Sequence, residues 1–221
     1  MNIQETAYWV NRLFPGEAAF HRVDAFTVAV FDNINPESPG EAVACTVDFG
    51  RVNTGLVTAA DAESVEVRSE LLCLARAEAS VPGRAVAAAA TMLHDASLAY
   101  RDALSSSPTG TTDMVPMHAQ PGQVLPGVGI LANLPQEGYT VNHGILADPR
   151  IWGPEIPFVR EEAGQVSVEP DDEDSGLARL TLPLQLILLT DEEFAVAAQH
   201  GGDVLFQQMA AQQVDLLDLH R

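Results

Sequence analysis

The segment that most constrains the fold runs from Ala178 to Leu217 and contains the strongest apolar run of the chain. Leucines occupy every second position from Leu180 to Leu188, which is the alternation typical of a β-strand. Pro183 interrupts this run. Because proline cannot donate a hydrogen bond to a neighbouring strand, we expect the strand to begin at a sheet edge or at a bulge. The rest of the chain is expected to pack against this segment.

A helix signal follows the strand directly. The residues from Thr190 to Glu193 have the S/T-x-x-E pattern of a capping box, which predicts a helix that starts at Asp191. Two glycines after His200 predict the end of that helix, because glycine adopts the left-handed conformation without a Cβ clash. Asp203 is then expected to cap a second short helix. The segment therefore predicts a strand, a helix, a tight break and a helix.

Upstream of this segment, β-branched or alternating runs predict further strands. These strands are expected at residues 24–31, 41–49, 65–74 and 138–147. The first two are expected to pair antiparallel across a turn-rich loop. The third carries Glu66, Arg68 and Glu70 on one face, which we expect to be in contact with water. Further short strands are expected around Val124 and Ile130.

Two more helices are expected, a short one at Ile3 to Phe14 and a long one at Pro82 to Leu104 with apolar residues at helical spacing. A chain of 221 residues with 47% apolar residues is large enough to bury a full core. Together the elements predict an α/β (α+β) fold. We expect a single compact domain with a mixed, mostly antiparallel sheet, one long helix and a C-terminal helix pair.

The chain is strongly acidic, with 31 acidic residues against 11 basic ones and a formal net charge of −20. This charge disfavours nucleic acids and anionic membranes as partners, and it favours either solubility alone or a basic protein partner. No apolar run approaches the length of a membrane helix, and the N-terminal residues do not resemble a secretion signal, so we expect a cytoplasmic protein. Every basic residue is arginine, which together with alanine-rich helices is typical of a GC-rich coding genome.

The two cysteines, Cys45 and Cys73, lie far apart in the sequence and form no C-x-x-C pair. Two cysteines are too few for a disulfide scaffold or a zinc site. Both fall on faces that we expect to point inward, an arrangement that allows them to be neighbours, and we expect both to be reduced core thiols.

The motifs that would support a cofactor or a metal ion are incomplete. The residues from Gly127 to Ala132 match G-x-G-x-x-A, but the flanking prolines leave no helix to hold a pyrophosphate. The acidic residues from Asp171 to Asp174 do not begin an EF-hand calcium loop, because position 12 of that loop would be Leu182, where a glutamate is required. We therefore expect no cofactor and no metal. One catalytic alternative remains, a pair formed by His118 or His143 with Asp148, for acid–base chemistry.

Two features are candidates for partner binding. The acidic run Asp171, Asp172, Glu173 and Asp174 is expected at a hairpin tip, where it either keeps the chain soluble or binds a basic partner. Trp152 opens a segment with two spaced prolines that we expect to be extended and exposed.

The C-terminal run LPLQLILLTDEEFAVAAQHGGDVLFQQM resembles suppressor-of-fused-like (SUFU) domains, in which an apolar strand, an acidic break, a helix, a histidine-glycine step and a second helix follow one another. Four upstream segments also resemble the family: FHRVDAFTVAVFD, AVACTVDFG, SVEVRSELLCLA and HGILADPRIW. The resemblance covers a core of about residues 20–213 within one domain at 1–221, while the loops at 53–63 and 114–123 depart from it.

This resemblance implies a compact, sandwich-like protein-binding domain without catalytic residues or a cofactor. Eukaryotic members resemble negative regulators that sequester a transcription factor, and stand-alone bacterial members resemble immunity proteins of toxin systems. Our first hypothesis is therefore a bacterial binding protein, in its specific form an immunity protein that neutralises a basic toxin. The alternatives are a small enzyme that uses His143 and Asp148, and a binding module without a toxin link.

Overall fold

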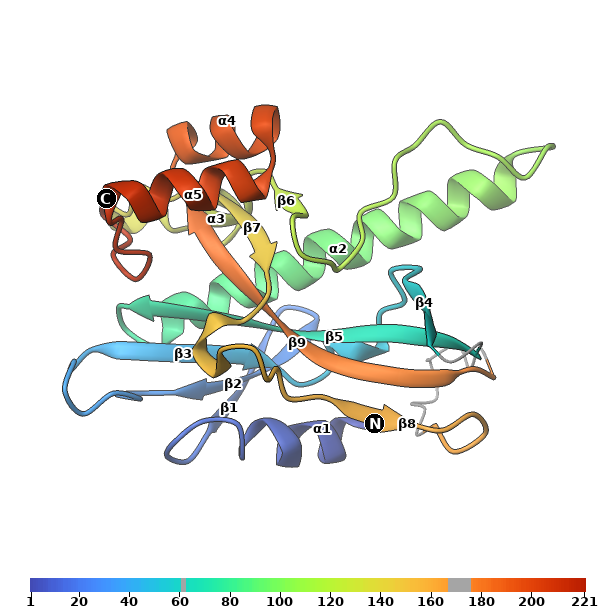
Figure 1. Ribbon diagram of the computed structural model, residues 1–221, viewed down its shortest axis with the longest axis horizontal. Coiled ribbons are helices and arrows are strands. Elements are labelled where there is room, and N and C mark those ends of the chain that lie inside the picture. Colours follow the sequence, from blue (N-terminus) through green and yellow to red (C-terminus); the bar gives the residue numbers. More distant parts are fainter. Residues whose placement is uncertain (61–62, 167–175) are drawn as a thin grey trace.

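Nine strands form one mixed sheet within the residues that the computed structural model describes, which are 1–60, 63–166 and 176–221 (Figure 1). The main path through the sheet is β1-β2-β3-β5-β9-β7-β6, while β4 pairs with β5 and β8 pairs with β9. The strands are β1 (Ala19–Val23), β2 (Phe26–Phe31), β3 (Glu41–Thr46), β4 (Val57–Ala60), β5 (Glu63–Arg76), β6 (Val124–Leu125), β7 (His143–Ala147), β8 (Val159–Glu161) and β9 (Ala178–Leu189). Only β5 and β9 pair parallel among these neighbours, which confirms the predicted mixed, mostly antiparallel sheet.

Helices cover both faces of this sheet (Figure 1). The long helix α2 packs on one face, over a core that includes Leu71 and Leu184. On the other face, α1 covers the N-terminal strands and the α4–α5 pair covers β7 and the end of β9. The helices are α1 (Ile3–Val10), α2 (Ser80–Ser106), α3 (Val128–Leu131), α4 (Asp191–His200) and α5 (Gly202–Gln212), with single 3₁₀ turns η1 (Phe49–Arg51), η2 (Pro135–Glu137) and η3 (Arg150–Trp152). The predicted long helix and C-terminal helix pair are both present.

The helices differ from their predicted bounds mainly at their ends. α2 extends the predicted Pro82 to Leu104 by two residues at each end, and its C-terminal half projects beyond the sheet (Figure 1). α1 ends at Val10, four residues before the predicted Phe14, because the chain turns there to pack Phe14 against the sheet. No helix within the described residues is long and apolar enough to span a bilayer.

The predicted alternation in β9 is confirmed. The leucines at positions 184, 186 and 188 join the core beneath α2, whereas Ile187 and Leu189 face α4 and α5. Both faces of the C-terminal half of β9 are therefore buried, which explains why that half is apolar at every position from Leu186 onward.

The expectation that Pro183 marks a sheet edge or a bulge is wrong, because β9 lies inside the sheet between β5 and β7. Pairing of β9 with β5 runs through Pro183, which stands opposite Glu70. On the other side of β9, pairing with β8 ends at Thr181 and pairing with β7 begins at Gln185. This gap in the ladder makes an interior position compatible with proline.

The face of β5 that we expected to be wet is buried. Glu66, Arg68 and Glu70 are 2%, 1% and 1% exposed. The parallel register places Arg179 of β9 opposite Glu66, and its Nε lies 3.2 Å from the Glu66 carboxylate. Arg68 Nη2 donates to the same carboxylate at 2.8 Å. Buried charges are stable when they are paired and hydrogen-bonded, so this strip belongs to the interior.

The helix start predicted at Asp191 is confirmed. The Thr190 hydroxyl accepts from the Glu193 N–H at 3.3 Å, and the Glu193 carboxylate accepts from the Thr190 N–H at 2.8 Å. The two bonds form the reciprocal capping box. α4 ends at His200 and α5 begins at Gly202. The prediction that Asp203 caps this helix is wrong, because Gly201 is the N-cap residue and Asp203 lies within the first turn.

Three strands were not predicted, and one predicted strand is a helix. β1, β4 and β8 lie in segments without a clear apolar alternation, where pairing with a neighbouring strand decides the conformation. The strand expected around Val124 is β6, whereas Ile130 lies in the one-turn helix α3. Gly127 has φ 77° immediately before α3, so the chain turns sharply there and cannot continue as a strand.

The cysteines are free and buried, as we expected, and they do not share one face of the sheet. Cys45 packs beneath α1 and Cys73 packs beneath α2, on opposite faces of the sheet. Burial raises the pKa of the Cys73 thiol to about 12, so this thiol stays protonated at neutral pH.

Candidate functional site

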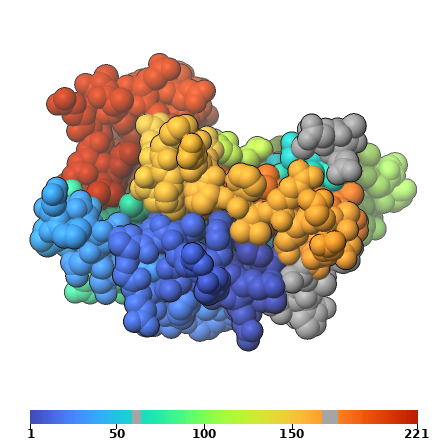
Figure 2. Space-filling view, turned by 60° about the horizontal axis from the view of Figure 1, so that its bottom comes forward, coloured from blue at the N-terminus to red at the C-terminus, as the bar shows by residue number. Residues whose placement is uncertain are grey.

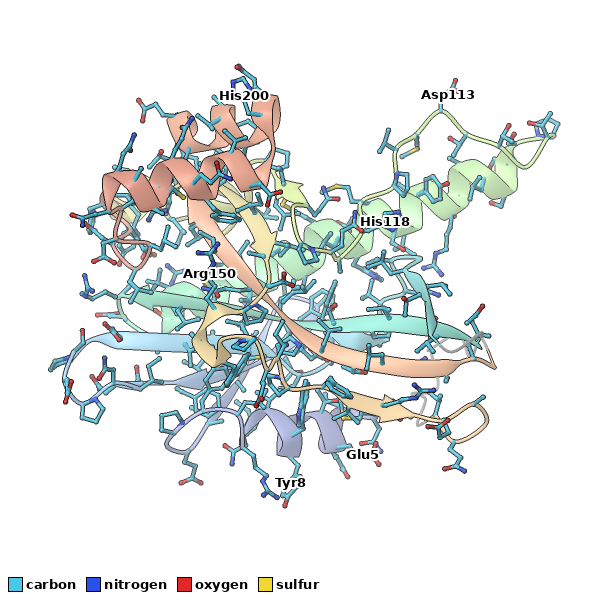
Figure 3. All side chains as sticks on the ribbon, in the orientation of Figure 1. Glu5, Tyr8, Asp113, His118, Arg150 and His200 are labelled. Carbon is cyan, nitrogen blue, oxygen red and sulfur yellow. The ribbon has the colours of Figure 1, made fainter. Side chains whose placement is uncertain are left out.

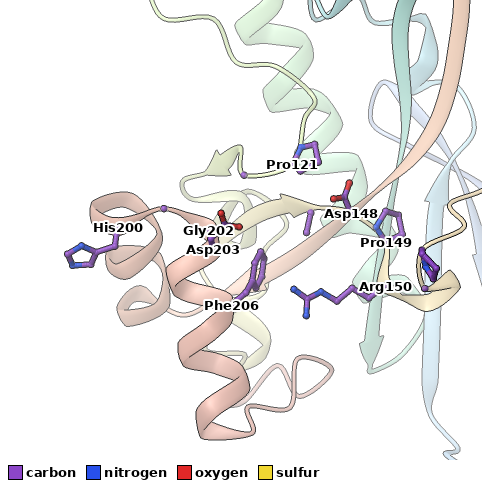
Figure 4. Close-up of a pocket in the computed structure, with 13 residues that line it drawn as sticks. Pro121, Asp148, Pro149, Arg150, His200, Gly202, Asp203 and Phe206 are labelled. Carbon is purple, nitrogen blue, oxygen red and sulfur yellow. The ribbon is translucent and has the colours of Figure 1, made fainter. Parts of the chain in front are cut away.

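An open hollow of about 660 Å³ lies where the loop after β7 faces the break between α4 and α5 (Figure 4). We call it the α5 cleft. Its lining comes from four segments, 121–122, 147–150, 153–154 and 200–206, with residues 204 and 205 outside the lining. The volume lies within the range of about 300–1,000 Å³ that is typical of ligand pockets. Elements from both the middle and the end of the chain therefore form one concave surface.

Glycines shape the wall of the cleft at the helix break. Gly201 has φ 85°, a left-handed conformation that turns the chain from α4 into α5. A Cβ on Gly202 would lie 3.0 Å from Ile145 Cδ1 and 3.8 Å from the Cα of Gly122. A side chain at position 202 would therefore require the Ile145 side chain of β7 to shift, whereas the 121–122 turn lies at an ordinary contact distance.

The polar groups of the cleft are two carboxylates and one guanidinium. Asp148 and Asp203 are exposed and approach the hollow from opposite walls (Figure 4). The Arg150 guanidinium lies over the Phe206 ring, with its Cζ 5.1 Å from the ring centroid, and the Arg150 N–H donates to Gln185 Oε1 at 3.3 Å. The Asp148 and Asp203 carboxylates can therefore accept hydrogen bonds from a cationic group of a ligand. They lie in the same cleft as the Phe206 ring, on which the Arg150 guanidinium already packs.

His200 contributes little to this surface. It lies at the end of α4, and Figure 4 shows its imidazole directed away from the other labelled residues.

The acid–base pair considered for catalysis is not formed by His143 and Asp148. They stand at opposite ends of β7, about 16 Å apart along an extended strand. His143 Nδ1 accepts from the Gly127 N–H at 2.9 Å, and Nε2 bonds the Asp191 carboxylate at 3.1 Å. The ring also stacks on Phe194 with a centroid distance of 4.0 Å. Both ring nitrogens are thus engaged in joining β7 to the turn before α3 and to the start of α4.

The other alternative, His118, is also engaged elsewhere. Its Nδ1 lies 2.5 Å from the Thr54 carbonyl oxygen, at the side of a separate hollow of about 310 Å³ beside the C-terminal half of α2. No group of three histidine, cysteine or acidic side chains is placed to hold a metal ion within the residues that the structure describes.

One buried carboxyl group, that of Glu70, has a raised pKa. Burial raises the pKa of Glu70 from its ordinary 4.5 to about 7, against the lowering effect of hydrogen bonds from Thr46, Gly50 and Phe49. Glu70 lies beneath α1, beside a hollow of about 20 Å³ that the N-terminal residues close. Glu70 does not line the α5 cleft, and its side chain is buried in the interior of the protein.

The predicted partner-binding residues have separate locations. Asp171, Asp172, Glu173 and Asp174 lie outside the residues that the structure describes. Trp152 is half-buried, and its ring packs on Phe14 with a centroid distance of 5.5 Å. A core contact thus uses part of the Trp152 surface, and its role in partner binding stays a prediction.

Sequence reasoning missed the residues that form the α5 cleft. Arg150, Asp203 and Phe206 come from segments more than fifty residues apart, so no local pattern joins them. The signal that was present is the clustering of turn residues, because Pro121-Gly122, Gly153-Pro154 and Gly201-Gly202 all border the hollow. Such pairs interrupt regular elements and leave space between them.

Comparison with known proteins places this architecture in a recognised fold. No protein-family model matches the chain, and no curated protein sequence matches it. A 1.40 Å crystal structure described as a SUFU (suppressor of fused protein) homolog from Neisseria gonorrhoeae FA 1090 aligns with a TM-score of 0.55 and 14% identity, over 98% of this chain and 93% of that one. The crystal structure of the Sufu-Fu complex aligns with a TM-score of 0.50 and 8% identity, over 97% and 84%.

The chain therefore has the fold of suppressor-of-fused proteins along nearly its whole length. This confirms the resemblance noted from the sequence at the level of fold.

Proposed function

We propose that this chain is a non-catalytic protein-binding module and that its partner docks in the α5 cleft. The observation that carries the proposal is the open hollow with carboxylates from Asp148 and Asp203 beside the Arg150–Phe206 stack. None of the lining residues that the structure describes is a serine, cysteine or lysine, so this surface offers no side-chain nucleophile of those kinds. Recognition, rather than bond making, is the chemistry that the cleft supports best.

The chemistry of the partner follows from charge. A chain with a net charge of −20 attracts basic proteins at long range and repels acidic ones. Asp148 and Asp203 would accept an arginine or lysine side chain of such a partner. A structure of the same fold stands in the Sufu-Fu complex, which supports a binding role. The specific form that we propose is a cytoplasmic bacterial immunity protein that neutralises a basic toxin.

The cleft is tested with the double variant Asp148→Asn/Asp203→Asn and a control, Asp95→Asn/Asp113→Asn. The control removes two exposed carboxylates elsewhere and changes the net charge equally. Each purified protein captures partners from lysate of the native host, and the captured protein is then titrated against all three chains. We expect the cleft variant to bind at least tenfold more weakly than the wild type and the control. Equal affinities for the three chains would exclude the cleft as the docking site.

The toxin link has its own experiment. The captured partner is expressed in a bacterial host with and without this chain, and growth is measured. Growth arrest that co-expression relieves would support an immunity role. A harmless partner would leave a binding module without a toxin link.

A further inference from the structure

β1 leaves one edge of the sheet open. Within the described residues β2 is its one partner in the sheet, and the register uses all five residues from Ala19 to Val23. The first four of these residues are exposed and the fifth is half-buried. The outer N–H and C=O groups of an edge strand have no strand partner, so this edge presents a template about 17 Å long for another extended chain.

This edge carries few of the devices that usually protect sheet edges. β1 contains no proline, the guanidinium of its one arginine, Arg22, is paired with Asp48 at 3.1 Å, and the pairing of β1 with β2 runs without a bulge from Val23 opposite Phe26 to Ala19 opposite Val30. The opposite edge is different, because β6 is only two residues long and Pro126 follows it. An open edge with a regular register is the geometry that β-strand addition uses.

A hollow of about 230 Å³ lies beside this edge, between α1 and the start of β1. Its walls include the rings of Tyr8 and Phe20, which are 66% and 46% exposed. Phe20 stands on the α1 side of the sheet because it pairs with Ala29, which packs in the core beneath α1. Figure 3 shows Tyr8 pointing outward from α1. The hollow is smaller than a typical small-molecule pocket, and its size suits one apolar side chain.

The walls of the hollow are held in place by local bonds. The Tyr8 hydroxyl accepts from Arg12 Nη1 at 2.8 Å, and the Ala18 N–H donates to Asn11 Oδ1 at 2.9 Å. The bond between Ala18 and Asn11 joins the residue before β1 to the residue that follows α1. A preformed hollow costs less ordering free energy when a ligand binds.

Charge beside the hollow selects the neighbouring residue of the ligand. Glu17 lines the hollow and is exposed, and the chain as a whole carries a net charge of −20. The N-terminal part of the chain, in blue, forms a broad part of the surface that Figure 2 shows. An extended ligand with lysine or arginine near its apolar side chain therefore fits this edge.

We propose that the open edge of β1 is a second docking surface, separate from the α5 cleft. It takes an extended peptide strand from another protein by strand addition. One apolar side chain of that strand enters the hollow between Tyr8 and Phe20, and a basic residue beside it meets Glu17. Main-chain hydrogen bonds to β1 supply affinity, and the hollow supplies the sequence preference.

The test uses four synthetic nine-residue peptides with alternating threonine and valine, in which the central residue is phenylalanine or alanine and the two residues beside it are lysine or glutamate. Binding is measured by fluorescence anisotropy, and the site is mapped by amide chemical shifts of the isotope-labelled protein. We expect the phenylalanine–lysine peptide to bind most tightly and to shift the amides of residues 19–23. Alanine at the centre should weaken binding at least tenfold, because the apolar side chain is lost from the hollow. N-methylation of alternate peptide residues along the pairing edge should abolish binding.

Variants of exposed residues identify the surface. Phe20→Ser should weaken binding of the phenylalanine–lysine peptide at least tenfold, whereas Val115→Ser, at a more exposed apolar residue on a distant loop, should leave its affinity unchanged. The cleft variant Asp148→Asn/Asp203→Asn should also bind this peptide normally, which separates this proposal from the proposed function. Thermal unfolding of each variant verifies its fold.

Three results would overturn the proposal. The first is the absence of binding by the phenylalanine–lysine peptide at millimolar concentration. The second is an affinity that Phe20→Ser leaves unchanged, or amide shifts confined to the α5 cleft. The third is self-association in analytical ultracentrifugation that Phe20→Ser abolishes, because the occupant of the edge would then be a second copy of this chain.

Discussion

Protonation of Glu70 should make this protein more stable in mild acid than at pH 8. The side chain is 1% exposed, and its Oε2 accepts from the Thr46 hydroxyl at 2.6 Å and from the Phe49 N–H at 3.1 Å. Oε1 accepts from the Gly50 N–H at 2.9 Å. These bonds favour the carboxylate, but the loss of water outweighs them, and the pKa rises from 4.5 to about 7.

The direction of the effect follows from proton linkage. Between pH 4.5 and 7 the folded protein binds a proton at Glu70 that the unfolded chain does not hold, so the free energy of unfolding rises as the pH falls. A pKa raised from 4.5 to about 7 corresponds to about 3 kcal/mol in full. Because part of the titration lies below pH 5, a change from pH 8 to pH 5 should recover about 2 to 3 kcal/mol from this group.

The assay compares urea unfolding of the wild type and Glu70→Gln at pH 8 and pH 5. Glutamine does not titrate, so the change in unfolding free energy between the two pH values should be more favourable in the wild type by about 2 to 3 kcal/mol. Other carboxyls cancel in this comparison, including Asp215, whose hydrogen bond with Arg76 lowers its pKa. Glu155→Gln is the matched control at an exposed carboxylate and should behave like the wild type.

An identical pH dependence in the wild type and Glu70→Gln would refute the reasoning, because burial would then not raise this pKa. A second measurement covers the case in which Glu70→Gln fails to fold. The ¹³C shift of the Glu70 carboxyl should titrate with a midpoint near 7 in the wild type, and a midpoint near 4.5 would also contradict the prediction.

Three further predictions concern stability and the acidic run. Thr190→Ala removes the capping bond to Glu193 and should lower the free energy of unfolding by about 1 kcal/mol in urea titrations; an unchanged value would mean that the cap is not formed in solution. Gly129→Ala places a Cβ only 2.1 Å from the Val141 carbonyl oxygen and should cost about 1–3 kcal/mol, visible as a lower Tm, unless the helix turn can shift freely. Replacement of the acids at 171–174 by their amides should leave Tm unchanged and weaken capture of a basic partner several-fold; equal capture would assign this run to solubility.

The sequence predicts elements whose signals are local. The alternation of β9 and the capping box at Thr190 each lie within a few residues, and both are present in the structure. The burial of Glu66 and Arg68 was beyond such reasoning, because their polar pattern is that of a solvated strand face. The ion pairs of Glu66 with Arg68 and with Arg179, which lies 113 residues further along the chain, make a buried position acceptable for these charges.

The candidate site was less predictable than the fold. A capping box needs four adjacent residues, whereas the α5 cleft needs Asp148 and Arg150 to meet Asp203 and Phe206 across two separate elements. The sequence correctly predicts the break after His200, but it does not predict that the loop after β7 faces this break. Periodicity predicts which face of an element is buried, and it does not predict which elements become neighbours.

The parallel pairing of β5 with β9 has a consequence for how the chain folds. It joins residues 113 positions apart, so closing this loop costs about 4 kcal/mol in chain entropy, whereas the β1-β2-β3 meander forms through short connections. The N-terminal strands are thus expected to assemble first, which leaves β5 as a temporary edge until β9 arrives. During that interval Glu66, Arg68 and Glu70 make this edge highly charged, and charged edges resist pairing with other chains. The three charged residues that are buried in the finished protein are thereby expected to reduce aggregation while the sheet is incomplete.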